Sequence, residues 1–106
     1  MNDPQFLEAA RHLAENSLRG NGGAADKAID DMAKRILARP LRAEERSVVL
    51  ETYNQLRDAY QQQQDEARKL LSVGESKPST EGSVPQLAAL AMVANQLLNL
   101  DEVLNK

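Results

Sequence analysis

The hydrophobic positions of this sequence recur at three- and four-residue steps, which is typical of amphipathic helices and predicts an all-α fold. The first helix is expected over residues 4–19, with Asp3 as its N-cap and Pro4 at its first position, where a missing N–H does no harm. Residues 20–23, Gly-Asn-Gly-Gly, end it because both residue types adopt the left-handed conformation that terminates helices. Its buried stripe should consist of Phe6, Leu7, Ala10, Leu13, Ala14 and Leu18.

Residues 24–38 carry the clearest amphipathic pattern of the chain and predict a second helix. Pro40 ends this helix, because the residue before a proline is pushed out of helical geometry. Its apolar face should be formed by Ala25, Ala28, Ile29, Met32, Ala33, Ile36 and Leu37.

A third helix is expected over residues 43–72, where Val49, Tyr53, Leu56 and Tyr60 keep the helical spacing. At 1.5 Å per residue, roughly 30 residues would span about 45 Å, which is more than a compact bundle of this size can cover. The glutamine run at residues 61–64 therefore leaves three alternatives. It projects as a polar arm, packs on something outside this chain, or interrupts the helix.

Residues 73–83 contain Gly74, Pro78 and Gly82 without hydrophobic periodicity, so we expect a flexible linker. The last helix, expected over residues 84–99, begins with a capping-box pattern in which Ser83 and Gln86 satisfy each other's backbone donors. This helix is apolar on every side, so it should lie at the centre and be covered by the other three. The chain is thus predicted to be one four-helix bundle-like domain over residues 1–106.

The composition excludes several kinds of site. The 106 residues suit one domain with a modest core. The absence of cysteine excludes disulfides, thiolate metal sites and cysteine nucleophiles within this chain. No apolar run approaches the roughly 18 residues needed to span a bilayer, so no membrane insertion is expected.

The charge distribution does not indicate a nucleic-acid partner. Thirteen Lys and Arg against sixteen Asp and Glu give a net charge of −3, and only three residues are aromatic. Nucleic-acid binders usually combine a basic face with stacking aromatics. The second and third helices can still be interpreted as a helix-turn-helix. However, the second helix of that motif would begin with Glu44 and Glu45, which repel phosphate.

The only histidine, His12, does not indicate a metal or catalytic site. Its neighbours one turn away are polar, which places it on the solvent side of the first helix, and a metal would need at least two more positioned ligands. These neighbours are Glu8, Glu15 and Asn16. With one such histidine, no Ser/His/Asp catalytic set can be assembled.

A carboxylate cluster near the start of the second helix is also better explained by structure than by chemistry. Acidic residues at this end are stabilised by the helix dipole, and Lys27 and Lys34 lie at salt-bridge spacing. The cluster consists of Asp26, Asp30 and Asp31. We therefore predict no catalytic, cofactor-binding or metal-binding residue, and no enzyme activity for this chain alone.

Three segments, residues 1–11, 36–45 and 87–102, taken in this order, resemble the C-terminal part of the domain of unknown function 1553. Residues 1–11 resemble the helix opening of that family, residues 36–45 resemble its interhelical turn, and residues 87–102 resemble its final helix. The matching motif positions are Asn2, Asp3, Pro4, Phe6, Arg39, Pro40, Glu45, Asn99 and Glu102. The chain departs from the pattern at Ala38, where the family favours Gly, at Arg42, which replaces a Thr cap, and at Val103, which replaces an aromatic residue.

The resemblance implies that the chain is part of a larger protein. Family members of this kind are large multidomain proteins of planctomycetes and related bacteria, often with a cytochrome c-like segment. An exported, periplasmic parent is therefore expected. The activity of the family is not established, so no catalytic residue and no cofactor carries over to this chain.

These observations favour a non-catalytic packing or interaction module that contacts the remainder of its parent or a second copy. The expected contact residues, which are also candidates for the internal core, are Tyr60, Leu70, Leu90, Met92, Val93 and Leu97. A second hypothesis is that the domain forms one wall of an active site that upstream domains complete. That hypothesis predicts a cleft lined by Arg39, Asn99 and Glu102.

Overall fold

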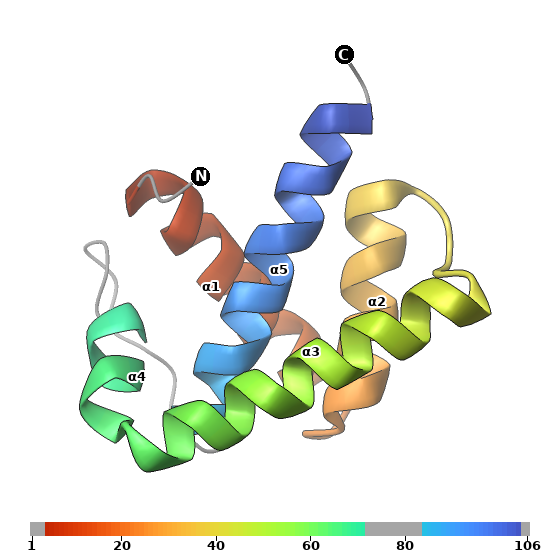
Figure 1. Cartoon of the computed structure of the whole chain (residues 1–106). Coiled ribbons are helices and arrows are strands. Elements are labelled where there is room, and N and C mark those ends of the chain that lie inside the picture. The colour runs from red at the N-terminus through yellow and green to blue at the C-terminus, as the bar shows by residue number, and fades with distance from the viewer. Residues whose placement is uncertain (1–3, 72–83, 105–106) are drawn as a thin grey trace.

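The structure is a computed structural model that describes the backbone of residues 4–71 and 84–104 and the side chains of residues 8–71 and 84–99. Within these ranges the chain is all-α, as predicted, with no strand. It contains five helices: α1 Pro4–Gly20, α2 Ala25–Leu37, α3 Ala43–Gln62, α4 Gln64–Leu71 and α5 Val84–Leu104 (Figure 1). The expected N-caps Asp3 and Ser83 and the expected linker lie outside the described residues.

Helix α5 lies at the centre of the molecule and packs against all four other helices. Figure 1 shows it in blue between α1 and α2, with α3 crossing it. Its side chains are buried on several faces because the sequence is apolar all round, which confirms the predicted central position. The buried residues of its first half are Pro85, Leu87, Ala88, Ala89, Leu90, Ala91, Val93 and Ala94.

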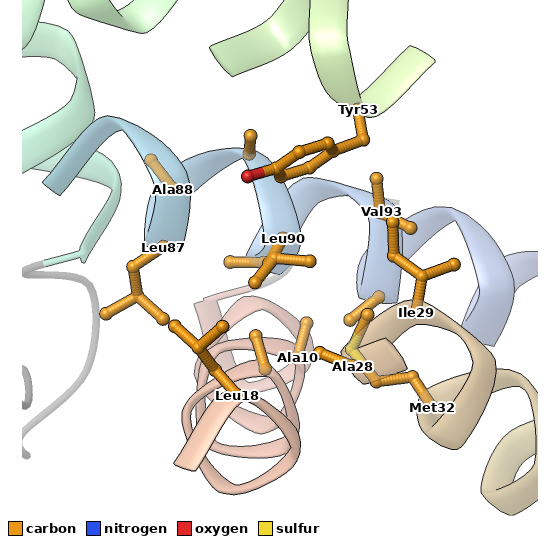
Figure 2. Close-up of a cluster of buried hydrophobic side chains, with 14 of the residues drawn as sticks. Ala10, Leu18, Ala28, Ile29, Met32, Tyr53, Leu87, Ala88, Leu90 and Val93 are labelled. Carbon is orange, nitrogen blue, oxygen red and sulfur yellow. The ribbon is translucent and has the colours of Figure 1, made fainter. Parts of the chain in front are cut away.

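The core is built around two side chains of α5. Figure 2 shows Leu90 and Val93 among side chains from α1 and α2, with the Tyr53 ring of α3 on the other side of α5. Half of the buried hydrophobic residues among those described are alanines. Small side chains let helix backbones approach closely, so a chain with few aromatics still forms a closely packed core.

The predicted third helix is interrupted at Gln63, which is one of the three alternatives for the glutamine run, so the described ranges contain five helices instead of four. The Gln63 N–H donates to the carbonyls of Ala59 at 3.1 Å and Tyr60 at 3.2 Å, while its own carbonyl accepts from the N–H groups of Glu66 and Ala67. Gln63 therefore ends α3 and starts α4. A straight helix over residues 43–71 would be about 43 Å long. The break keeps the longest extent of the molecule to 33 Å and buries Ala67 of α4.

Helix α1 confirms part of its predicted stripe and departs from it in one respect. Ala10, Ala14 and Leu18 are buried, whereas the side chains of Phe6 and Leu7 lie outside the described residues. Three polar side chains are buried beside this stripe: Arg11, Glu15 and Ser17. Glu15 was expected on the solvent side, so that part of the prediction is wrong. His12, placed on the same side, is half-buried.

Candidate functional site

The turn between α2 and α3 is held by an ion pair between two positions of the second family-like motif. Arg39 Nη1 donates to Glu45 Oε1 at 2.8 Å, and Nη2 donates to Oε2 at 3.1 Å. The backbone N–H of Arg42 also donates to Glu45 Oε1, at 2.9 Å. The hydrogen bonds from Arg39, followed by the one from Arg42, lower the pKa of Glu45 to about 2. Glu45 thus both caps α3 and closes the turn.

The same turn requires a left-handed backbone at Ala38. This residue ends α2 with φ 59° and ψ 23°, and it is the only non-glycine residue with positive φ in the described ranges. A side chain in this conformation costs roughly 1–2 kcal/mol relative to a right-handed residue. Position 38 therefore has the geometry that favours glycine at a helix C-terminus.

A second ion pair joins α2 to α3. Arg46 Nε donates to Asp30 Oδ1 at 2.9 Å, and Arg46 Nη2 donates to Asp30 Oδ2 at 3.2 Å. The same Nη2 lies 3.9 Å from Asp26 Oδ2. Asp31 pairs with Arg35 at 3.3 Å. The carboxylate cluster is therefore held by arginines, rather than by Lys27 and Lys34 as predicted. Among the described residues, no group of three or more His, Cys, Asp or Glu side chains could hold a metal ion.

An open hollow of about 370 Å³ lies between the first half of α3 and the end of α5. We call it the Val48 hollow; it is lined by Leu41, Glu44, Glu45, Val48, Val49 and Leu97. Val48 is 63% exposed, the only large hydrophobic side chain of the described residues that is exposed. Four of the residues that line the Val48 hollow have aliphatic side chains, so the hollow exposes apolar surface to solvent. The helical stripe of the third helix contained Val49 and not Val48, so sequence analysis missed this residue.

The outward face of α3 beside the Val48 hollow is acidic. Its exposed residues follow one another at steps of four and three, and they are Glu44, Val48, Glu51, Gln55 and Asp58. Asp58 forms an ion pair with Arg57, in which Oδ1 lies 3.4 Å from Nη2. Glu44 and Glu51 have no side-chain partner among the described residues. Neither cation of α3 pairs with Glu44 or Glu51: Arg46 pairs with Asp30, and Arg57 contacts Asp58 and the Tyr53 ring.

The predicted contact residues differ in how deeply they are buried. Leu90, Val93 and Leu97 are buried in the core, and Leu97 also lines the Val48 hollow. Tyr60, Leu70 and Met92 are half-buried. Among the side chains that the structure describes, the exposed large hydrophobic residue is therefore Val48 of α3.

Two of the three residues of the predicted active-site wall, Arg39 and Asn99, can be placed in the described ranges. Arg39 is paired with Glu45 at the α2–α3 turn, Asn99 is half-buried on α5, and the Glu102 side chain lies outside the described residues. A second, polar hollow of about 560 Å³ lies at the α3–α4 corner and is lined by residues 61–66. Neither hollow contains Arg39 or Asn99.

A buried arginine on α1 is a further feature that the sequence did not indicate. Arg11 is 1% exposed and its Nη1 donates to the Leu71 carbonyl at 2.7 Å. Its Nε lies 3.8 Å from Glu15 Oε1, and its Nη2 lies 3.5 Å from His12 Nε2. Because Arg11 Nη1 donates to the carbonyl of the last residue of α4, this cluster joins α1 to α4. The spacing along α1 could have indicated this burial, since position 11 lies two helical turns before the buried Leu18 and therefore on the same face.

Comparisons with models of protein families, with curated proteins and with solved structures found no match. No helix in the described part of the chain is both long and apolar enough to cross a membrane.

Proposed function

We propose that this chain is a non-catalytic helical interaction module that binds a partner through the Val48 hollow. The partner is the remainder of a larger protein or a second copy. The observation that carries this proposal is the exposure of Val48 beside an aliphatic hollow. Burying one such side chain contributes about 1.5–3 kcal/mol of apolar transfer free energy, which is enough for one anchor of an interface.

Contacts within the chain fix the walls of the Val48 hollow in the absence of a partner. The Arg39–Glu45 and Arg46–Asp30 pairs fix the start of α3 against the end of α2. Leu97 of α5 is fixed by its packing in the buried hydrophobic core. A rigid hollow loses little conformational freedom on binding, so more of the contact energy appears as affinity.

We propose no catalytic role for the charged residues, because their interactions join helices. Glu45 and Arg39 close a turn, and Arg11 connects α1 to the end of α4. The resemblance to the domain of unknown function 1553 supports the same interpretation, since Arg39 and Glu45 are motif positions that pair with one another. We infer from that resemblance alone that the chain comes from the C-terminal part of an exported bacterial multidomain protein.

Photo-crosslinking at position 48 tests the proposal. Val48 is replaced by p-benzoylphenylalanine in the cells that produce the protein, and the matched control carries the same group at Asn54, an exposed polar position of α3. We expect a discrete conjugate from position 48 and none from position 54. A conjugate of twice the chain mass identifies a second copy. Conjugates from both positions, or from neither, would contradict a docking surface at Val48.

A further inference from the structure

We infer that the partner of the Val48 hollow is a cationic amphipathic helix, an inference that rests on the proposed function above. One apolar side chain of this helix enters the hollow, and Lys or Arg side chains on either side of it contact Glu44 and Glu51. The occupant follows from charge complementarity, because Val48, the only large hydrophobic side chain of α3 that is exposed, lies between two carboxylates that have no partner among the described residues.

The spacing of these residues fits a helix. Glu44, Val48 and Glu51 occupy positions i, i+4 and i+7 and so share one face of α3. Seven residues at 1.5 Å each separate the two glutamates by about 10 Å along the helix axis. A partner helix that carries one cation four positions to one side of an apolar residue and another cation three positions to the other side spans the same distance. Its apolar residue can then contact Val48 while its two cations contact Glu44 and Glu51.

The charges of Glu44 and Glu51 on this face are not paired within the described residues, whereas Asp58 pairs with Arg57. Arg46 is directed to Asp30, and Arg57 lies over the Tyr53 ring. Arg42 precedes α3 as its N-cap and falls outside the spacing of the stripe. An incoming cation therefore meets carboxylates that no arginine of α3 already pairs with, and this favours cationic partners over neutral ones.

The same charges disfavour two other occupants. A second copy that binds through this face would bring Glu44 and Glu51 of one copy near the same residues of the other, and like charges at an interface are destabilising. A nucleic acid would bring its phosphates against the carboxylates of α3. Self-association and nucleic-acid binding are therefore outcomes of the test that contradict this inference.

Three matched peptides measure the charge preference. Each is an alanine-based helix of about 18 residues, long enough to hold helical structure in water, with one central Leu. The peptides differ only at the positions three and four residues on either side of the Leu, which carry Lys, Gln or Glu. Each is titrated into the full chain at about 10 mM salt, where the Debye length is about 30 Å. The readout is the amide NMR shifts of Glu44, Val48, Glu51 and Leu97.

We expect the Lys peptide to bind about fivefold more tightly than the Gln peptide, and the Glu peptide to bind most weakly. Glu51→Lys should weaken Lys-peptide binding about fivefold. The matched control Glu66→Lys makes the same charge change on α4 and should alter the affinity less than about twofold. Raising the salt to about 0.15 M should reduce the difference between the Lys and Gln peptides.

Failure of this inference differs from failure of the proposed function. If the Gln or Glu peptide binds at Val48 as tightly as the Lys peptide, the cationic partner is excluded while docking at the hollow stands. If the Lys peptide shifts no amide around Val48, or shifts them equally in the Val48→Ser variant, both ideas are overturned. Concentration-dependent shifts of the same amides without peptide would indicate a second copy and would also overturn the inference.

Discussion

The guanidinium of Arg11 donates a 2.7 Å hydrogen bond to the backbone carbonyl of Leu71, which is sixty positions away in the sequence. This bond joins the middle of α1 to the last residue of α4. A helix leaves its last carbonyls without partners inside the helix, and a cation near that end also complements the helix dipole. Arg11 therefore holds the short helix that the break at Gln63 creates.

Replacing Arg11 should destabilise the protein substantially. Arg11→Ala leaves the buried Glu15 and the Leu71 carbonyl without the guanidinium, and removing one partner of a buried charged pair costs about 3–5 kcal/mol. Urea unfolding measures this loss. Hydrogen exchange of the α4 amides should accelerate more than that of the α2 amides.

The double variant Arg11→Ala/Glu15→Ala is the control for the role of the pair. Residues in contact are not additive, so the double variant should lose less stability than the sum of the two single variants. Additive losses, together with unchanged exchange in α4, would show that Arg11 does not hold this helix.

Ala38→Gly should stabilise the protein by about 0.5–1 kcal/mol. Glycine removes the cost of a left-handed alanine, and part of this gain is offset by the greater freedom of glycine in the unfolded chain. The matched control is Ala59→Gly on the exposed side of α3, where the same change should cost about 1 kcal/mol. Thermal unfolding of both variants checks the opposite signs. Equal destabilisation by the two changes would exclude the left-handed conformation of Ala38.

The Arg39–Glu45 pair should make stability depend on pH in acid. The pKa of Glu45 is lowered to about 2 in the folded protein, against 4.5 for the unperturbed group. Its contribution is therefore fully present above about pH 4.5 and is lost as the pH falls towards 2. Glu45→Gln should destabilise the protein at pH 6 and have a smaller effect at pH 3.

Urea unfolding at the two pH values measures this difference. The control is Glu51→Gln, which removes an exposed carboxylate without a partner among the described residues and should have the smaller effect at pH 6. An effect of Glu45→Gln that stayed constant from pH 6 to pH 3 would contradict the pairing with Arg39.

The helices that depend on local pattern were predictable, and the contacts that depend on tertiary placement were not. The all-round apolar sequence of α5 predicts a central helix, and the face of α2 predicts buried Ile29 and Met32. The glutamine run contains no Gly or Pro, so nothing local selects one of the three alternatives. Packing of Ala67 and Leu71 against the core selects the break.

The candidate site was missed for a related physical reason. A helical stripe identifies the residues that face the core, and Val48 lies beside that stripe on α3. Whether Val48 borders a hollow depends on where Leu97 of α5 lies relative to α3. The sequence of α3 alone does not determine that position. Burial of Arg11 depends in the same way on Leu71 of a distant helix. The Arg39–Glu45 pair was within reach, because both residues flank one short turn.

Titration of the Lys peptide into the wild-type chain and the Val48→Ser variant tests the central claim most directly, provided that unfolding is measured on the same samples. Val48 is exposed, so Val48→Ser should change the free energy of unfolding by less than about 0.5 kcal/mol. The same change should weaken peptide binding about tenfold, because Val48 is the most exposed of the aliphatic side chains that line the hollow. Unchanged binding in a stably folded Val48→Ser variant would contradict the claim that this chain binds its partner through the Val48 hollow.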